Sequence, residues 1–190
     1  MADILLGIDV ELFRLINSVF INGFFDVVLS AVTSSRNWMP IFIVGLVSLL
    51  WKGGTKGRTC VLLLLVTVSI TDPVNSRILK PLVDRQRPSH ALVGARVLVP
   101  DNGGASFPST HAANMFAAAY ILSFFYSQRR ILWIAIAFLV AYSRVYVGVH
   151  YPADVAGGAI VGVTIAWGVI SLFQLWQTTQ GRYKNTGGRT

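Results

Sequence analysis

Long stretches without a charged residue alternate with short polar segments along most of this chain. A helix that crosses the hydrocarbon core of a bilayer, about 30 Å thick, needs roughly 20 mostly apolar residues. Together with their flanking residues, the uncharged stretches predict spanning helices near residues 38–52, 58–80, 110–126, 130–149 and 152–176. Aromatic side chains fall close to several predicted ends, as interfacial residues do; these are Trp38, Trp51, Tyr126, Trp133 and Trp176.

The first residues follow another pattern, in which apolar and polar positions take opposite faces of one helix. With helical spacing, Ile8, Leu12 and Leu15 share one face, while Asp9 and Arg14 belong to the other. An amphipathic helix of this kind lies in the membrane interface. The pattern therefore predicts an interfacial helix over residues 5–21.

The segment over residues 24–35 is short for a membrane span and carries Asp26. The chain has six spanning helices if this segment is one of them and five if it is not. We expect six. The predicted fold is thus all-α: an integral-membrane helical bundle of six transmembrane helices plus the N-terminal interfacial helix.

Composition supports a membrane protein. Of the 190 residues, 54% are hydrophobic and only 13% are charged, and the mean hydropathy is +0.61. Soluble domains carry about twice as much charge, and disordered segments combine low hydrophobicity with high charge. The length indicates a single domain over residues 1–190. The one cysteine, Cys60, excludes an internal disulfide and a multi-cysteine metal site.

The net charge of +8 and the pI near 10.2 would suggest nucleic acid in a soluble protein. In an apolar chain the excess instead marks cytoplasmic loops, so we expect a bilayer and no nucleic acid as partner. Connecting the helices in order places three basic segments on the cytoplasmic face, including a tail over residues 178–190. Their cations are Lys52, Lys56, Arg58, Arg129, Arg130, Arg182, Lys184 and Arg189. Residues 81–108 and 148–151 then lie on the opposite face.

Three polar clusters collect at that opposite face. In the first, Lys80 stands six residues before Arg87 and Pro88. Fixed cations beside a membrane surface suit a phosphate, although cations at a helix end also snorkel to lipid headgroups. The second cluster, residues 107–111, precedes an apolar helix. It can serve as a helix cap or as an anion site at a helix N-terminus, and it places His111 beside whatever anion binds there.

The third cluster is Ser143 and Arg144, then His150 and Asp154. A charge as far into a span as Arg144 is costly, and this makes a functional role the default expectation. If the turn at His150 opens the next helix, Asp154 can reach one ring nitrogen and leave the other free as a nucleophile. The competing interpretation is a buried histidine–aspartate hydrogen bond without chemistry.

Together, the three clusters resemble the signature of the type 2 phosphatidic acid phosphatase (PAP2) superfamily, K-x6-R-P, P-S-G-H and S-R-x5-H-x3-D. The matching region spans residues 80–154. In order, the matches are Lys80, Arg87 and Pro88; Pro108, Ser109 and His111; and Ser143, Arg144, His150 and Asp154. One position departs from the signature, because Thr110 stands where the family usually has glycine. Threonine still presents a backbone N–H there, but its branched side chain restricts the turn, so the change bears on substrate preference.

The resemblance implies a bacterial membrane lipid phosphatase that forms a phosphohistidine. His150 would attack phosphorus, Asp154 would orient it, and His111 would protonate the leaving oxygen and later activate water. The phosphate would be held by Lys80, Arg87, Ser109, Thr110 and Arg144. No metal or other cofactor is expected. The implied place is the bacterial inner membrane, with the active site facing the periplasm or the cell exterior.

Three substrates stay open at this point: undecaprenyl diphosphate, phosphatidylglycerophosphate and the 1-phosphate of lipid A. Two other activities stay open as well, a lipid phosphotransferase that uses the same site and a non-catalytic lipid transporter or flippase. The oligomeric state is also undetermined. Two smaller expectations concern packing: Asp72 ends a kinked helix and pairs with Arg77, and Gly158 with Gly162 allows close helix contact within the bundle.

Overall fold

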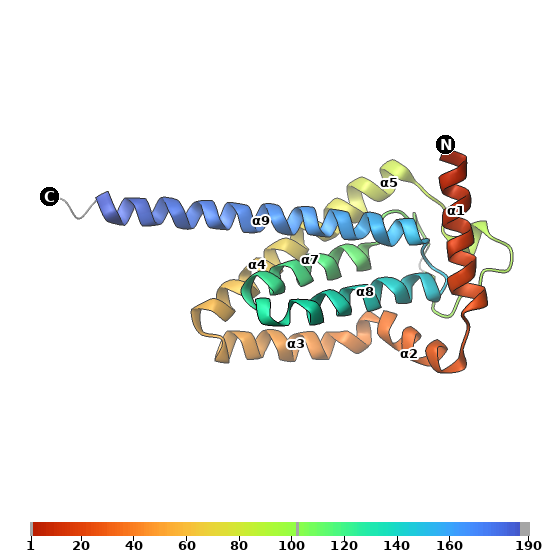
Figure 1. The fold of residues 1–190 in the computed structure, drawn as a ribbon, viewed down its shortest axis with the longest axis horizontal. Helices are drawn as coiled ribbons and strands as arrows, with labels where there is room; N and C mark the ends of the chain where they lie inside the picture. Colours follow the sequence, from red (N-terminus) through yellow and green to blue (C-terminus); the bar gives the residue numbers. More distant parts are fainter. Residues whose placement is uncertain (1, 102, 187–190) are drawn as a thin grey trace.

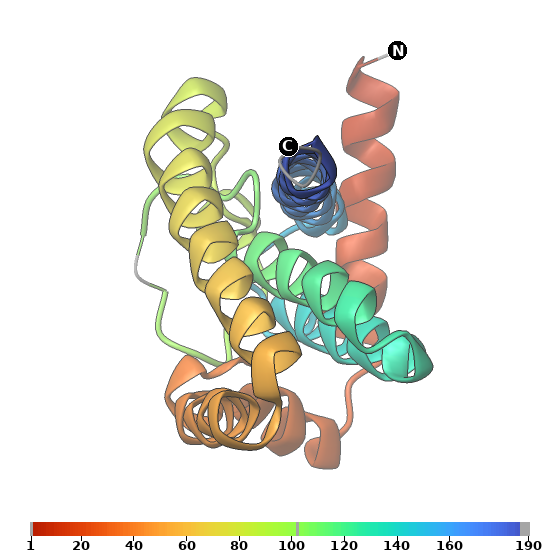
Figure 2. The same ribbon diagram turned by 90° about the vertical axis from the view of Figure 1, so that its left-hand side faces the viewer.

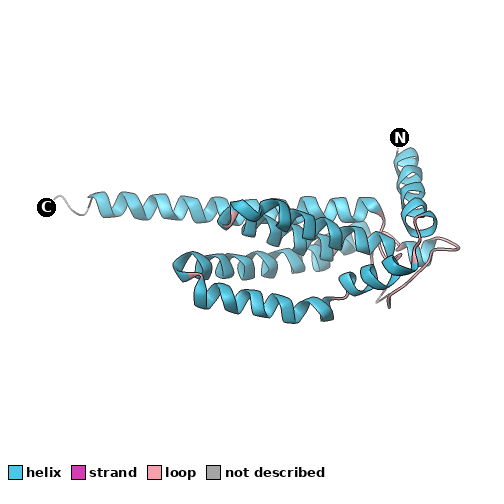
Figure 3. Ribbon diagram, turned by 60° about the horizontal axis from the view of Figure 1, so that its bottom comes forward, coloured by secondary structure: helices cyan, strands magenta, loops and turns pink. Residues whose placement is uncertain are grey.

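The computed structural model describes residues 2–101 and 103–186, and in this part of the chain it contains helices and loops but no strand (Figure 3). The main helices are α1 (Ala2–Arg14), α2 (Gly23–Thr33), α3 (Ser35–Lys52), α4 (Gly54–Pro73), α7 (Thr110–Phe125), α8 (Arg130–Tyr146) and α9 (Pro152–Thr186). The short helices α5 (Lys80–Val83) and α6 (Pro88–Ala91) follow α4. The all-α prediction is confirmed.

Helices α3, α4, α7, α8 and α9 run side by side along the long axis of the molecule, and α1 lies across one end of them (Figures 1 and 2). Helix α7 is central, because it packs against α4, α8 and α9. Helix α3 packs mainly against α4 and has no buried residue. The bundle therefore has a tight side around α7 and a loose side at α3.

The helical backbone does not end at Asp72 as expected. After Pro73 the chain passes through a π-helical segment, Val74–Leu79, directly into α5. Asp72 therefore does not end a helix, and it makes no ion pair with Arg77 within the described residues. Its Oδ1 instead accepts a hydrogen bond from Nδ2 of Asn114 on α7, at 3.3 Å. The expected Asp72–Arg77 pair is wrong because the uninterrupted helix turns Asp72 toward α7.

Two helices of the described part are long and apolar enough to cross a bilayer by themselves, and the number becomes three if a bent pair is one span. The bent pair is Ile4–Val19 with Gly23–Thr33, which meet at 118°. Helices α7 and α8 have 16 and 17 residues, just short of a full span on length alone. The count of six transmembrane helices stays a prediction.

The N-terminal helix is amphipathic, but its polar face does not point toward water as expected. Asp9, assigned to the polar outer face, is buried together with Asn17 and Phe13. Ile8 and Leu12 are exposed. The reason is that the two polar side chains find partners inside the protein: Asn17 bonds the backbone of the loop after α6 and of α8, and Asp9 bonds residues of the site described below.

The basic segments gather as expected. The α3–α4 turn, the α7–α8 turn and the C-terminal end of α9 all lie at one end of the bundle, and the loops before α7 and α9 lie at the other (Figure 1). Of the predicted cytoplasmic cations, Arg189 and the side chains of Arg182 and Lys184 fall outside the described residues.

Helix α9 touches α7 through glycine. A Cβ atom on Gly158 would lie 2.3 Å from the backbone oxygen of Ser109, and one on Gly162 would lie 2.0 Å from that of Ala113. Both distances are far below van der Waals contact. This G-x-x-x-G therefore permits backbone-to-backbone packing inside the bundle.

We expect Gly162→Ala to lower the stability of the protein by about 1–3 kcal/mol, since the added methyl group must push α9 away from α7. Gly168→Ala is the matched control, because nothing lies within 4 Å of its added Cβ and alanine is the better helix former. Thermal unfolding in detergent measures both variants. Equal melting temperatures would contradict the close contact.

Candidate active site

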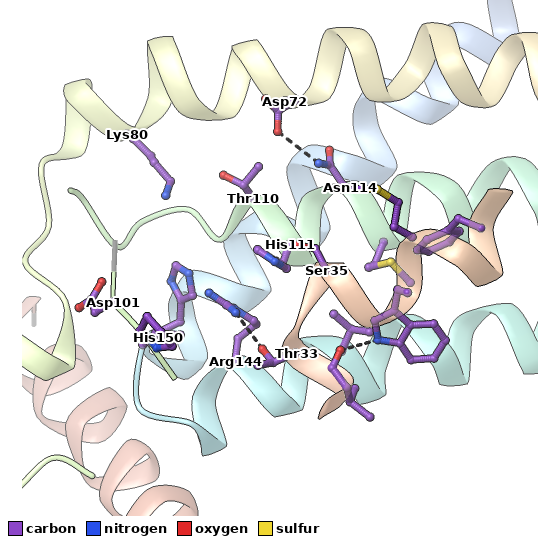
Figure 4. A pocket seen from close by; sticks show the side chains of 18 of the residues that line it. Thr33, Ser35, Asp72, Lys80, Asp101, Thr110, His111, Asn114, Arg144 and His150 are labelled. Carbon is purple, nitrogen blue, oxygen red and sulfur yellow. Dashed lines mark hydrogen bonds between the residues drawn. The ribbon is translucent and has the colours of Figure 1, made fainter. Parts of the chain in front are cut away.

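A cavity of about 610 Å³ opens at the end of the bundle that carries the loops before α7 and α9. Six of the eight predicted site residues line it: Lys80, Arg87, Thr110, His111, Arg144 and His150. The other two, Ser109 and Asp154, are fully buried next to it. Figure 4 shows the residues converging from α5, α7, α8 and the loops between helices. The structure thus brings together residues that are 70 positions apart along the chain.

Helix ends determine this convergence. Lys80 begins α5, Thr110 and His111 begin α7, and Arg144 belongs to the last turn of α8. His150 follows a sharp turn at Gly148, which has a φ of +89°. A Cβ at Gly148 would lie 2.2 Å from the backbone oxygen of Arg96, so only glycine fits there.

The three cations keep unused donors. Arg87 donates hydrogen bonds from Nε and Nη1 to the carbonyl oxygens of Gly103, Gly104 and Val149. Its Nε also lies 3.4 Å from Asp101 Oδ1. Arg144 donates Nη1–H to Thr33 Oγ1 at 2.8 Å, while its buried Nε has no partner. Lys80 makes no hydrogen bond or ion pair with any described residue. Positive charge with free N–H groups in one cavity favours a bound anion.

His150 is 2% exposed, and its Nδ1 lies 3.4 Å from Asp154 Oδ2, long for a hydrogen bond. Its Nδ1 is otherwise unpartnered. Catalytic hydrogen bonds are often long before substrate binds. Burial lowers the pKa of His150 to about 4, with Arg144 and Arg87 acting in the same direction against Asp154. The imidazole is therefore neutral at neutral pH, which is the state a nitrogen nucleophile requires.

Besides its contact with His150, the Asp154 carboxylate accepts hydrogen bonds from two groups. Asp154 is the third residue of α9, and its Oδ2 accepts the backbone N–H of Tyr151 at 2.8 Å, which caps the helix. Its Oδ1 accepts from Arg85 Nη1 at 2.9 Å. Arg85 also donates to Asp9 Oδ2 at 2.7 Å and lies 3.8 Å from the centre of the Tyr151 ring. Asp9 in turn accepts the N–H of Ala153.

Arg85 and Asp9 were not among the site residues expected from the sequence. Arg85 was visible as an extra cation near the first motif, but only the fold reveals that it faces a carboxylate and not the phosphate. Asp9 looked like a solvent-facing residue of an amphipathic helix. Both are positioning residues, because they act on Asp154 and do not line the cavity.

We expect Arg85→Lys to lower kcat by about tenfold to a hundredfold with little change in KM, because the ammonium cannot bridge two carboxylates as a guanidinium does and small misplacements are costly. Arg77→Lys is the control, since Arg77 is exposed and lies outside the cavity. Steady-state kinetics separate kcat from KM. A selective rise in KM would indicate that Arg85 binds substrate directly.

Ser109 and Thr110 differ from expectation in detail. The Ser109 hydroxyl is fully buried and accepts the N–H of Ala112 at 3.5 Å, so it caps α7 and does not line the cavity. Thr110 does line it, and its hydroxyl accepts a hydrogen bond from Nδ2 of the buried Asn75 at 2.8 Å. Asn75 also donates to the carbonyl of Pro108. The bulkier residue at the glycine position is therefore accommodated by a partner on the π-helical segment.

A second acidic group borders the site. Asp101 accepts hydrogen bonds from the Ser89 hydroxyl and the Gly103 N–H, and Nε2 of His90 lies 3.1 Å from it. Burial raises the pKa of Asp101, but these hydrogen bonds and the charges of Arg87 and His90 outweigh it and lower the pKa. Within the described residues no three metal-ligating side chains form a cluster that could hold a metal ion.

The far part of the cavity is apolar. Its walls there are side chains of α3 and of neighbouring helices, among them Trp38, Met39, Phe42, Ile43 and Leu46. Met39 and Ile43 are more than half exposed at the surface of the loosely packed α3. The cavity therefore joins a cationic end to an apolar end that reaches the side of the bundle.

This combination of a helical bundle, two histidines and three cations around one cavity defines a phosphate-handling membrane protein. Comparison with known proteins agrees: a family model, the PAP2 superfamily, matches residues 59–178. The chain belongs to the PAP2 superfamily.

Several known proteins are similar to it. Lipid A 4'-phosphatase of Bacteroides thetaiotaomicron is 34% identical over 178 residues, covering 88% of this chain and 77% of that protein. Undecaprenyl-diphosphatase of Sulfolobus acidocaldarius is 34% identical over 169 residues, covering 85% and 77%. The crystal structure of a transmembrane PAP2-type phosphatidylglycerolphosphate phosphatase from Bacillus subtilis superposes with a TM-score of 0.69 at 25% identity, covering 90% of this chain and 86% of that one.

Proposed function

We propose that this protein is an integral-membrane lipid phosphatase that forms a phosphohistidine at His150. The observation that carries the proposal is the cavity itself, in which the free donors of Lys80, Arg87 and Arg144 surround two histidines beside an apolar channel. In a lipid phosphate, the phosphate group fits the cationic end of such a cavity and the lipid chain fits the apolar end. Relatives whose names describe lipid phosphatases support the same reaction.

The first chemical step is an in-line displacement. Nε2 of His150 attacks phosphorus, the bond from phosphorus to the lipid oxygen breaks, and His111 gives its proton to that oxygen. Asp154 lies on the Nδ1 side and stabilises the imidazolium that forms. The three cations hold the equatorial oxygens as negative charge redistributes.

The second step returns the enzyme to its starting state. His111, now neutral, takes a proton from a water molecule, the water oxygen attacks phosphorus, and the phosphorus–nitrogen bond breaks. Inorganic phosphate leaves and His150 is neutral again. No metal ion is needed for either step.

The site would face the periplasm or the cell exterior of a bacterial inner membrane. This proposal rests on the separation of the two ends, with the basic turns at one and the cavity at the other (Figure 1). Positively charged loops stay on the cytoplasmic side. Labelling of single cysteines, introduced into a Cys60→Ala background at Ser89 and at Lys56, by a membrane-impermeant reagent tests the orientation; exclusive labelling at Lys56→Cys would overturn it.

The activity is tested on the purified full chain in detergent. With a chelator present, we expect phosphate release from a lipid phosphate and inhibition by vanadate, which mimics the pentacoordinate transition state. Phosphate transfer to an added lipid alcohol, at the expense of release, would favour the phosphotransferase. Binding of lipid without any release would favour a transporter.

A further inference from the structure

Beyond the phosphate-binding end, the cavity contains two polar side chains that the proposed reaction does not use. Asp72 on α4 and Asn114 on α7 both line it (Figure 4). Asn114 lies three residues after His111, which places it on the same face of α7. The pair therefore stands next to the general acid, between the phosphate-binding residues and the apolar wall of α3.

Both side chains have acceptor atoms without donors. Asn114 uses Nδ2 to bond Asp72 Oδ1 at 3.3 Å, and its buried Oδ1 has no partner. Asp72 forms no ion pair with a cation in the described part of the chain, and its Oδ2 receives no hydrogen bond there. The Asn114 oxygen is a buried atom, and buried polar atoms are rarely left unsatisfied. Asp72 is exposed in the structure, but an ionisable group within a membrane helix is costly without a function.

The direction of the reaction assigns this pair to one part of the substrate. His150 and His111 act on opposite sides of phosphorus in an in-line displacement, so the leaving oxygen lies on the His111 side. The leaving group then continues past His111 toward Asn114 and Asp72 before its chain reaches α3. The Asn114 amide oxygen and the Asp72 carboxylate would then face the first atoms beyond the leaving oxygen.

We infer that the leaving group is a hydroxylated alcohol, a sugar or a glycerol, whose O–H or N–H groups donate to Asp72 and Asn114. This inference rests on the proposed lipid phosphatase activity and narrows its substrate to a phosphate monoester. In a prenyl diphosphate, the second phosphoryl group would occupy the same place, and its oxygens would face the Asp72 carboxylate. The three cations of the cavity already surround the phosphate that is attacked, so they do not offset this repulsion of the second phosphoryl group.

Matched lipids test the hydroxyl group without any mutation. We compare 1-acylglycerol 3-phosphate with the 2-deoxy compound of the same chain, which lacks only the hydroxyl next to the phosphorylated carbon. The expected kcat/KM is at least about tenfold higher for the hydroxylated lipid, because a site built to bond a hydroxyl rejects the analogue without it. Equal values would overturn the inference.

Variants test the charge. In Asp72→Asn, and in Asp72→Ser as a second variant, the kcat/KM ratio of farnesyl diphosphate to farnesyl monophosphate is expected to rise by about tenfold, since repulsion of the second phosphoryl group is removed. Asp84→Asn is the control: Asp84 lies outside the cavity with φ of +44°, which asparagine also adopts. An unchanged ratio in both Asp72 variants would contradict the inference.

A lipid A-type disaccharide monophosphate and phosphatidylglycerophosphate distinguish a sugar from a glycerol leaving group, and faster turnover of either supports the inference. Faster turnover of a prenyl diphosphate than of both would refute it while the proposed phosphatase stands. Absence of phosphate release from all of these lipids would refute the proposed function, and the inference with it.

Discussion

Replacing His150 with glutamine is expected to abolish turnover, with kcat reduced by about a thousandfold or more, because the amide cannot replace the imidazole that forms the covalent intermediate. Wild-type protein quenched in alkali after mixing with a ³²P-labelled lipid should retain label, since phosphohistidine survives base and is lost in acid. The variant should retain none. Asp84→Asn, outside the cavity, should label like wild type.

Full activity in His150→Gln would remove the nucleophile from the mechanism. Label that resists acid would instead indicate a phosphoserine or phosphothreonine, for which the cavity offers Thr33, Ser35 and Thr110. Because the Gln side chain has nearly the length of the imidazole, a melting temperature close to wild type checks that the bundle is intact.

Replacing His111 with alanine should give a result that depends on the leaving group. For an alkyl phosphate we expect a loss of about 10²- to 10⁴-fold, the usual contribution of a general acid. For an aryl phosphate, whose leaving oxygen needs no proton, the first step should stay fast. Water activation in the second step is lost as well, so the phosphoenzyme should accumulate.

Rapid-mixing measurements with an aryl phosphate should therefore show a burst of about one equivalent of phenol followed by slow release of phosphate. Asn114→Ala, one turn along the same helix face, is the comparison, because it removes a cavity residue but leaves both half-reactions their histidine. A proportional loss on both substrates, without a burst, would mean that His111 binds the phosphate and does not transfer protons.

The main helices and the motif positions could be predicted because they are local properties of the chain. Uncharged runs identified α3, α4, α7, α8 and α9, and the polar clusters marked their ends. The starts predicted near residues 110 and 152 agree with the observed starts of α7 at Thr110 and of α9 at Pro152. Antiparallel connection then sufficed to place His111, Arg144 and His150 at one end of the bundle.

The supporting contacts could not be predicted, because they join residues from distant helices. Arg85 finds Asp9 and Asp154 only after α1 has packed across the start of α9. The hydrogen bond between Asp72 and Asn114 depends on how α4 and α7 are rotated relative to each other. It also depends on the π-helical segment after Pro73, which no sequence pattern predicted. Asp9 and Asn17 are likewise buried against the protein, because their partners come from distant segments of the chain.

The glycine contact between α7 and α9 has a consequence for how the protein can diversify. Backbone meets backbone at Gly158 and Gly162, so the spacing between the acid and the nucleophile is independent of side-chain size. Helix α3, by contrast, buries no residue and touches the remainder loosely. Exchanging residues 35–52 between relatives should therefore retune acyl-chain selectivity while the reacting atoms keep their separation, which makes this segment a natural unit for engineering chimeras.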